Sequence, residues 1–75
     1  MTYWVKRILL KSGEIVTERE LLPHENLFEG KVPVVGDTLT VSCRGRRFEA
    51  RVIWGNWPGR VHELGTIVPL RVEEI

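Results

Sequence analysis

The sequence has one cysteine, Cys43, and no long apolar run. A lone cysteine cannot form an internal disulfide, and a small domain without disulfides is typical of a reducing compartment, so we expect a cytoplasmic protein. The apolar residues near the N-terminus are interrupted by Lys6 and Arg7, which is unlike a secretory signal. No stretch reaches the roughly 18 apolar residues of a membrane helix. The sequence therefore predicts neither secretion nor membrane insertion.

Residues typical of catalytic or metal sites are few and scattered. His24 and His62 are each followed by glutamate, but a metal site made of protein ligands needs three or four residues at characteristic spacing. Cys43 falls at an inward position of an expected strand, where a cysteine packs rather than reacts. The glycines of residues 55–65 do not stand between a strand and a helix, as a phosphate-binding loop requires. We expect no enzyme activity, no catalytic residue, no metal and no cofactor.

Size and charge indicate one small domain over residues 1–75, with 43% hydrophobic and 28% charged residues. A net charge of +1 gives no overall attraction to nucleic acid or to acidic membranes. The charge is uneven, however, because residues 44–60 contain five arginines and one glutamate. Any surface that binds anions is therefore expected in the second half of the chain.

Apolar and polar residues alternate on both sides of Arg44-Gly45. This period of two, over residues 38–43 and 46–54, predicts two half-buried strands. A two-residue turn places Val41 opposite Phe48 and brings both apolar sets to one face. A four-residue loop within residues 44–47 would keep the same parity, whereas a three-residue loop would mix the faces. The same parity turns Trp54 inward, into the core.

A second hairpin is predicted around Ser12-Gly13, because glycine supplies the positive φ that such turns require. Pairing across this turn sets Leu10 opposite Ile15 and Arg7 opposite Glu18, both favourable cross-strand pairs.

Residues 21–31 predict one short helical turn, with Pro23 at its first position and Leu27 and Phe28 as its apolar contact. Residues 66–75 predict a final strand, in which Pro69 favours an edge position or a bulge because it cannot donate a hydrogen bond.

These elements predict a mainly β fold: a small, five-stranded, antiparallel, SH3-like, partly open barrel with one short helical turn. The stretches VVGDTLTV and FEARVIWG resemble the pattern of a glycine-aspartate pair followed by a strand in many such barrels. We therefore expect a non-catalytic binding module.

The first hypothesis for its ligand is single-stranded nucleic acid. Small barrels bind single strands with a basic groove along the backbone and aromatic side chains on which bases stack. Trp57, which stands in a turn-rich loop, is the expected stacking residue, unless it only covers one end of the barrel. The phosphate contacts would come from Arg44, Arg46, Arg47, Arg51 and Arg60. The alternative is that these arginines are only the solvated polar side chains on the outer face of the hairpin.

The alternative hypothesis is a protein-interaction module, or a subunit of a homo- or hetero-oligomer, that uses the edges of its sheet. Tyr3, Trp4 and Val5 put apolar bulk on both faces of the first strand, and the strand with Pro69 is an expected edge. Exposed apolar edges are typical of self-association and of pairing with an extended peptide.

Overall fold

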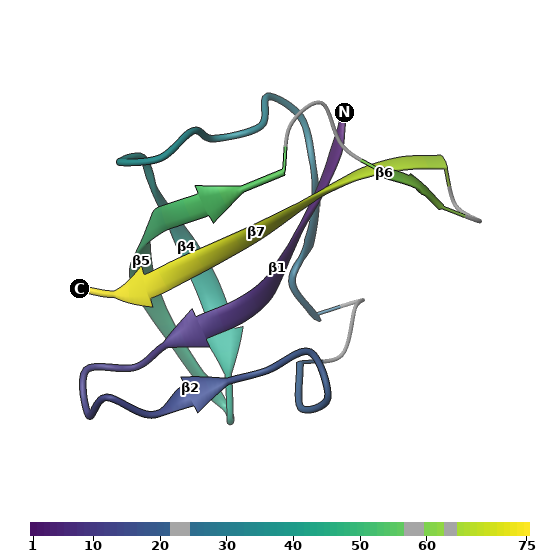
Figure 1. Cartoon of the computed structure of the whole chain (residues 1–75). Coiled ribbons are helices and arrows are strands. Elements are labelled where there is room, and N and C mark those ends of the chain that lie inside the picture. Colours follow the sequence, from purple (N-terminus) through teal and green to yellow (C-terminus); the bar gives the residue numbers. More distant parts are fainter. Residues whose placement is uncertain (22–24, 57–59, 63–64) are drawn as a thin grey trace.

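The computed structural model describes residues 1–21, 25–56, 60–62 and 65–75, and at residues 60–62 and 65–66 it describes the backbone alone. Seven strands form one sheet (Figure 1). They are β1 (Thr2–Leu9), β2 (Ile15–Val16), β3 (Leu27–Glu29), β4 (Thr38–Cys43), β5 (Arg46–Gly55), β6 (Arg60–His62) and β7 (Gly65–Glu74). In the described part of the chain, no helix has the length and apolarity needed to cross a membrane.

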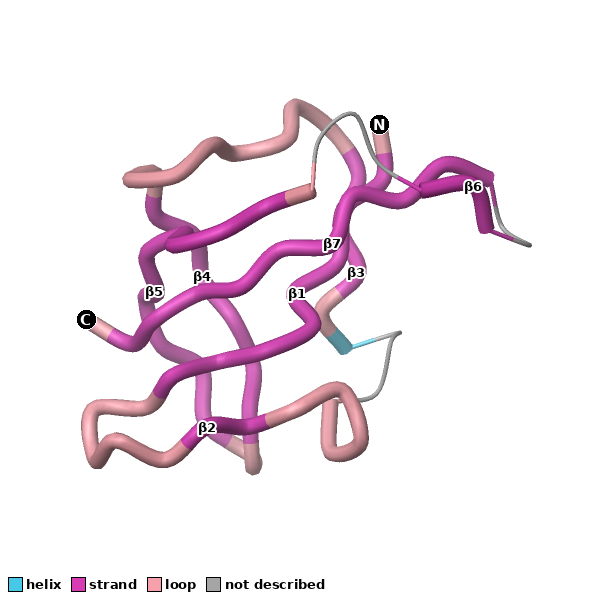
Figure 2. Tube along the Cα trace, in the orientation of Figure 1, coloured by secondary structure: helices cyan, strands magenta, loops and turns pink. Residues whose placement is uncertain are grey.

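The strands follow the order β2-β1-β7-β5-β4, with β3 paired to β1 and β6 paired to β7. Figure 2 shows the two long central strands, β1 and β7, running side by side. The end strands β2 and β4 do not pair with each other, so the sheet is open. The mainly β prediction is confirmed.

The prediction of five antiparallel strands is wrong, because β1 and β7 pair in parallel. A parallel pair needs a long connection, and here nearly the whole chain lies between the two strands. Local alternation of apolar and polar residues cannot predict the pairing of strands so far apart in sequence.

One core lies on the inner face of this sheet. Because successive strand residues point to opposite faces, each long strand contributes the residues of its inward face to this core. The core consists of Val5, Ile8, Leu10, Val16, Leu21, Val41, Cys43, Ala50, Val52, Val68, Leu70 and Val72.

The hairpin of β4 and β5 has the predicted register. Val41 lies opposite Phe48 and Cys43 opposite Arg46. Arg44 and Gly45 form the turn, with φ values of 52° and 76°. Two positive φ values in a two-residue turn match the twist of the flanking strands. Val41 is buried and Phe48 half-buried, so the apolar face is the one predicted.

The first hairpin differs from the prediction by one residue. Leu9, not Leu10, lies opposite Ile15, and Ile8 lies opposite Val16. The N–H of Leu10 donates to the carbonyl of Glu14 at 2.9 Å, so the turn is longer than two residues. Since a shift of one residue exchanges the two faces, Val16 is buried and Ile15 is 61% exposed.

Two β-bulges lie on either side of β7. The register with β1 shifts between Val5 and Arg7, and the register with β5 shifts between Val52 and Trp54. A bulge adds one residue to a strand and so reverses the alternation beyond it. Trp54 is therefore 37% exposed, and the prediction that it belongs to the core is wrong.

Pro69 lies in a central strand and not at an edge, which corrects the prediction for the last strand. Its carbonyl accepts a hydrogen bond from Asn56 N at 3.1 Å, so its nitrogen also faces the side of β5. The ladder with β5 ends at Leu70 and the ladder with β6 begins at Ile67. Pro69 thus stands between the end of the β5 ladder and the start of the β6 ladder. The N–H that proline lacks would have no partner strand at this position.

The N-terminal strand is also not an edge. β1 lies between β7 on one side and β2 and β3 on the other. Val5 is buried in the core, and Tyr3 stacks on Phe28 with ring centroids 5.3 Å apart. Trp4 lies opposite Pro69, which is buried. The apolar residues at positions 3–5 are thus largely used within the domain, rather than presented at an edge.

The expected helical turn falls partly on Pro23, which lies outside the described residues. The residues expected to supply its apolar contact, Leu27 and Phe28, belong to strand β3 and pair with Trp4 and Tyr3. The helical turn is not confirmed, and Leu27 and Phe28 make their contacts as residues of a strand.

Candidate nucleic-acid interface

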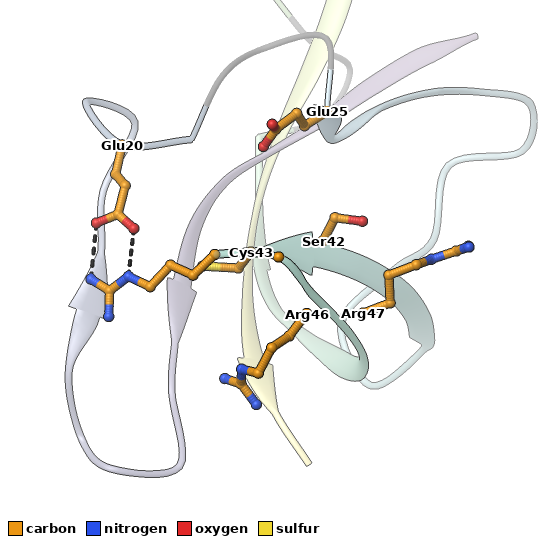
Figure 3. A pocket seen from close by; sticks show the side chains of 8 residues that line it. Glu20, Glu25, Ser42, Cys43, Arg46 and Arg47 are labelled. Atoms are coloured by element: carbon orange, nitrogen blue, oxygen red, sulfur yellow. Dashed lines mark hydrogen bonds and ion pairs between the residues drawn. The ribbon is translucent and has the colours of Figure 1, made fainter.

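Arg44, at the tip of the β4–β5 hairpin, is held by two carboxylates. Its guanidinium donates to both oxygens of Glu14, at 2.9 and 2.7 Å, and to both oxygens of Glu20, at 2.5 and 2.9 Å. Figure 3 shows the pair with Glu20 at close range. Hydrogen bonds from Arg44 lower the pKa of Glu14 and of Glu20, and those carboxylates raise the pKa of Arg44. The predicted phosphate contact is thus already bound to two internal anions.

Two more of the predicted arginines have acidic partners. Arg46 Nη1 lies 3.3 Å from Glu74 Oε2, and the guanidinium also lies over the Phe48 ring, 4.8 Å from its centroid. Arg51 Nη1 lies 3.6 Å from Glu73 Oε1, its partner across the strands. The side chains of both arginines and of Glu73 are at least a third exposed, whereas that of Glu74 is 11% exposed. A phosphate would have to compete with both carboxylates for these arginines.

The hairpin borders a shallow hollow of about 510 Å³ with mixed charge. Its lining includes the predicted residues Arg44, Arg46 and Arg47 together with Glu20 and Glu25. In Figure 3, Arg46 and Arg47 extend in different directions from the hairpin. Among the described side chains, no carboxylate lies within ion-pair distance of Arg47. The acidic residues make this hollow a weak anion site.

The remaining predicted residues do not join this group. Arg51 does not line the hollow. Trp57 lies outside the described residues, and the side chain of Arg60 is not described.

A second cluster, not expected from the sequence, lies on the outer face of the sheet. The guanidinium of Arg71 is 4.5 Å from the centroid of the Trp54 ring, and Lys6 Nζ is 5.9 Å from it. Trp54 comes from β5, Arg71 from β7 and Lys6 from β1, so three neighbouring strands build the cluster. We call Lys6, Trp54 and Arg71 the outer-face cluster.

The two β-bulges assemble this cluster. Arg71 of β7 pairs with Arg7 of β1 on one side and with Trp54 of β5 on the other. Arg7 and Trp54 are the first paired residues after the register shift in their own strands. A bulge redirects side chains locally, which here turns Trp54 toward Arg71. Ile53, the extra residue of β5, is 40% exposed beside the indole.

Two polar atoms on this face are buried and have no hydrogen-bond partner among the described residues. They are Nε1 of Trp4 and Nε of Arg71. Buried N–H groups are nearly always paired, so these two donors are exceptions within the described part of the structure. Neither Lys6 nor Arg71 forms an ion pair within the described part of the structure.

The sequence carries no direct signal for this cluster. Lys6 and Arg71 are isolated cations in strands, and the alternation over residues 46–54 places Trp54 in the core. Only the bulges, which depend on the pairing of distant strands, bring the three residues together. No family model, no curated protein and no solved structure matches this chain.

Proposed function

We propose that this protein is a non-catalytic binding module, of an SH3-like small-barrel type, that binds single-stranded nucleic acid at the outer-face cluster. The observation that carries this proposal is a tryptophan, 37% exposed, beside two cations with no acidic partner in the described part of the chain. Stacking on an aromatic ring together with cationic phosphate contacts is the usual means of binding a single strand.

The barrel type rests on the small sheet that bends around one core, with its end strands unpaired. The parallel pairing of β1 and β7 departs from the all-antiparallel arrangement first expected.

A single strand suits this cluster better than a duplex. Bases within a duplex stack on each other and expose only their edges, whereas an unpaired base offers its face to an indole. Arg71 and Lys6 would then contact the phosphates on either side of the stacked base. Binding of this kind tolerates many sequences and weakens as salt rises.

The hairpin arginines have a secondary role in this proposal. Arg44, Arg46 and Arg51 each have an acidic partner, so a phosphate must displace a carboxylate before it binds them. Arg47, which has no such partner among the described residues, is the hairpin residue best placed to add a contact. Trp57 and Arg60 stay within the proposal as further contacts.

Amide chemical shifts during titration with a dT12 or rU12 oligonucleotide test the proposal. We expect shifts centred on Lys6, Trp54 and Arg71 at about 50 mM salt, where even nonspecific phosphate contacts register. Trp54→Ala should weaken binding by about 1–3 kcal/mol with little change in salt dependence.

Two double variants with the same loss of charge separate the two surfaces. Lys6→Gln/Arg71→Gln should reduce the slope of log affinity against log salt by about 1.4, since each phosphate contact on a single strand contributes about 0.7. Arg46→Gln/Arg47→Gln should change the slope by less. If the second variant has the larger effect, the hairpin is the site. If no oligonucleotide shifts any amide, the protein does not bind nucleic acid.

A further inference from the structure

The outer edge of β4 carries backbone groups that the fold does not use. The N–H and C=O of Ser42 pair with the side chain of Asn26 and therefore point away from β5. In an antiparallel pair, alternate residues point their backbone groups to opposite sides, so those of Thr40 and Thr38 point to the same outer side as Ser42. Within the described part of the chain, no hydrogen bond outside the sheet ladders reaches the backbone of either threonine.

β3 offers a second partly unused edge. The carbonyl of Asn26 accepts from Val5 N at 3.0 Å, and Gly30 N donates to Met1 O at 2.9 Å. By the same alternation, Leu27 and Glu29 turn their backbone groups away from β1. β3 and β4 thus each have an edge that faces no neighbouring strand of the sheet.

A hollow of about 420 Å³ lies beside the start of β4. Its lining comes from β1, from β4 and from the segment that joins β3 to β4, and consists of Tyr3, Lys31, Val32, Pro33, Asp37, Thr38 and Leu39. Tyr3, Val32 and Leu39 pack against the core but are only half-buried. The open side of the sheet thus combines a hollow of mixed, mainly polar lining with unpaired backbone groups.

We infer that this open side is a strand-acceptor site for an extended peptide segment of a protein partner. The segment pairs its backbone with Thr38 and Thr40 and places one side chain in the hollow beside Tyr3 and Leu39. Donors and acceptors that alternate along a strand edge are matched by another extended chain, and an edge strand recognises peptides in this way.

The fold itself shows which chemical group suits this edge. The carboxamide of Asn26 is equivalent to one peptide group, and it pairs with Ser42 as a neighbouring strand would, at 2.9 and 3.1 Å. A partner strand would continue this pairing from Asn26 along Thr40 and Thr38. The site lies at an edge of the sheet and not at the outer-face cluster, so it does not depend on nucleic-acid binding.

The test uses octapeptides selected against the whole protein from a random displayed library, followed by synthesis of the best peptide. We expect the amide hydrogens of Thr38 and Thr40 to exchange at least about tenfold more slowly in the complex, because a new strand protects them. N-methylation of the peptide at alternate residues provides the matched control. Methyl groups on one parity should reduce affinity by about tenfold each, and those on the other parity should have little effect.

A variant of the protein tests the same edge from its own side. Thr40→Pro removes a donor that the fold does not use and should reduce peptide affinity by about tenfold, while the N-methyl series remains informative if this variant folds poorly. The inference is overturned if no peptide is selected, or if the selected peptide leaves the exchange of Thr38 and Thr40 unchanged. It is also overturned if these amides become protected in the protein alone as its concentration rises, since the occupant is then a second copy of the chain.

Discussion

The side-chain carboxamide of Asn26 joins the backbone of Ser42 through two hydrogen bonds, with Nδ2 to the carbonyl at 2.9 Å and the Ser42 N–H to Oδ1 at 3.1 Å. The backbone carbonyl of the same asparagine accepts from Val5 N. One fully buried residue thus links β1 to β4, two strands that do not pair, and closes the open sheet at one point.

Asn26→Ala should therefore destabilise the fold. The substitution leaves the N–H and C=O of Ser42 without partners in a partly buried place, and a buried polar group that loses its partner costs about 1–3 kcal/mol. Urea denaturation followed by circular dichroism measures the change. Asn56→Ala is the matched control, because Asn56 contributes its backbone N–H to Pro69 and should lose little. Equal losses in the two variants would contradict a closing role for Asn26.

Trp54→Ala should cost far less stability than a core substitution. Trp54 is 37% exposed and its contacts include two cations, and exposed cation–π contacts are worth about 0.5–1 kcal/mol each. Leu70→Ala removes a fully buried side chain of the central strand, for which about 2–5 kcal/mol is expected. Chemical denaturation of the two variants gives the comparison, and a loss for Trp54→Ala as large as for Leu70→Ala would place the indole in the core after all.

The Arg44 pairs should make stability depend on pH in the acid range. Hydrogen bonds from Arg44 lower the pKa of Glu14 and Glu20 below their ordinary value of 4.5 in the folded state. A lowered folded pKa gives stability that is present above the unfolded pKa and is lost as pH falls through the folded pKa. Arg44→Gln should therefore melt at a lower temperature than the wild type near pH 7, and the gap should narrow below about pH 4.5.

Salt provides the control for this prediction. Exposed ion pairs are screened, so the difference in melting temperature at pH 7 should also shrink as salt is added. A gap that is unchanged by both acid and salt would mean that Arg44 acts through its turn conformation and not through its charge.

Gly45→Ala should destabilise the β4–β5 hairpin through the backbone alone. Gly45 has φ of 76°, and an added Cβ would meet no atom within 4 Å, so crowding does not contribute. A side chain in the left-handed region costs about 1–2 kcal/mol. Gly45→Asn should lose less, because asparagine tolerates this region better than alanine. Thermal denaturation of both variants checks the order, and an alanine variant as stable as the asparagine variant would contradict it.

The sequence was most informative where structure is local. The β4–β5 register follows from Val41 and Phe48, since only one parity of turn puts both on the same face. The first hairpin was predicted one residue out of register because Leu10 and Ile15 form as plausible an apolar pair as Ile8 and Val16. The longer turn around Gly13, with φ of 94°, decided between them.

The candidate site was less predictable than the fold because it depends on distant strands. The sequence indicated no acidic partner for Arg44 in the turn. In the structure it forms ion pairs with Glu14 and Glu20, which are far away in sequence. Trp54 was assigned by parity to the core, and the bulge that turns it outward arises only where β5 pairs with β7. Periodicity within one segment contains no information about either contact.

The parallel pair of β1 and β7 also affects the order of folding. β7 is the last strand in the chain, yet it lies at the centre of the sheet between β1 and β5. The β4–β5 pair depends on local contacts, but β1 has no central neighbour until β7 is available. Contacts between residues so far apart in sequence slow folding. During synthesis, the inner face of β1 therefore lacks its cover from β7 until that strand has left the ribosome, and apolar surface exposed in this way favours aggregation of an unfinished chain.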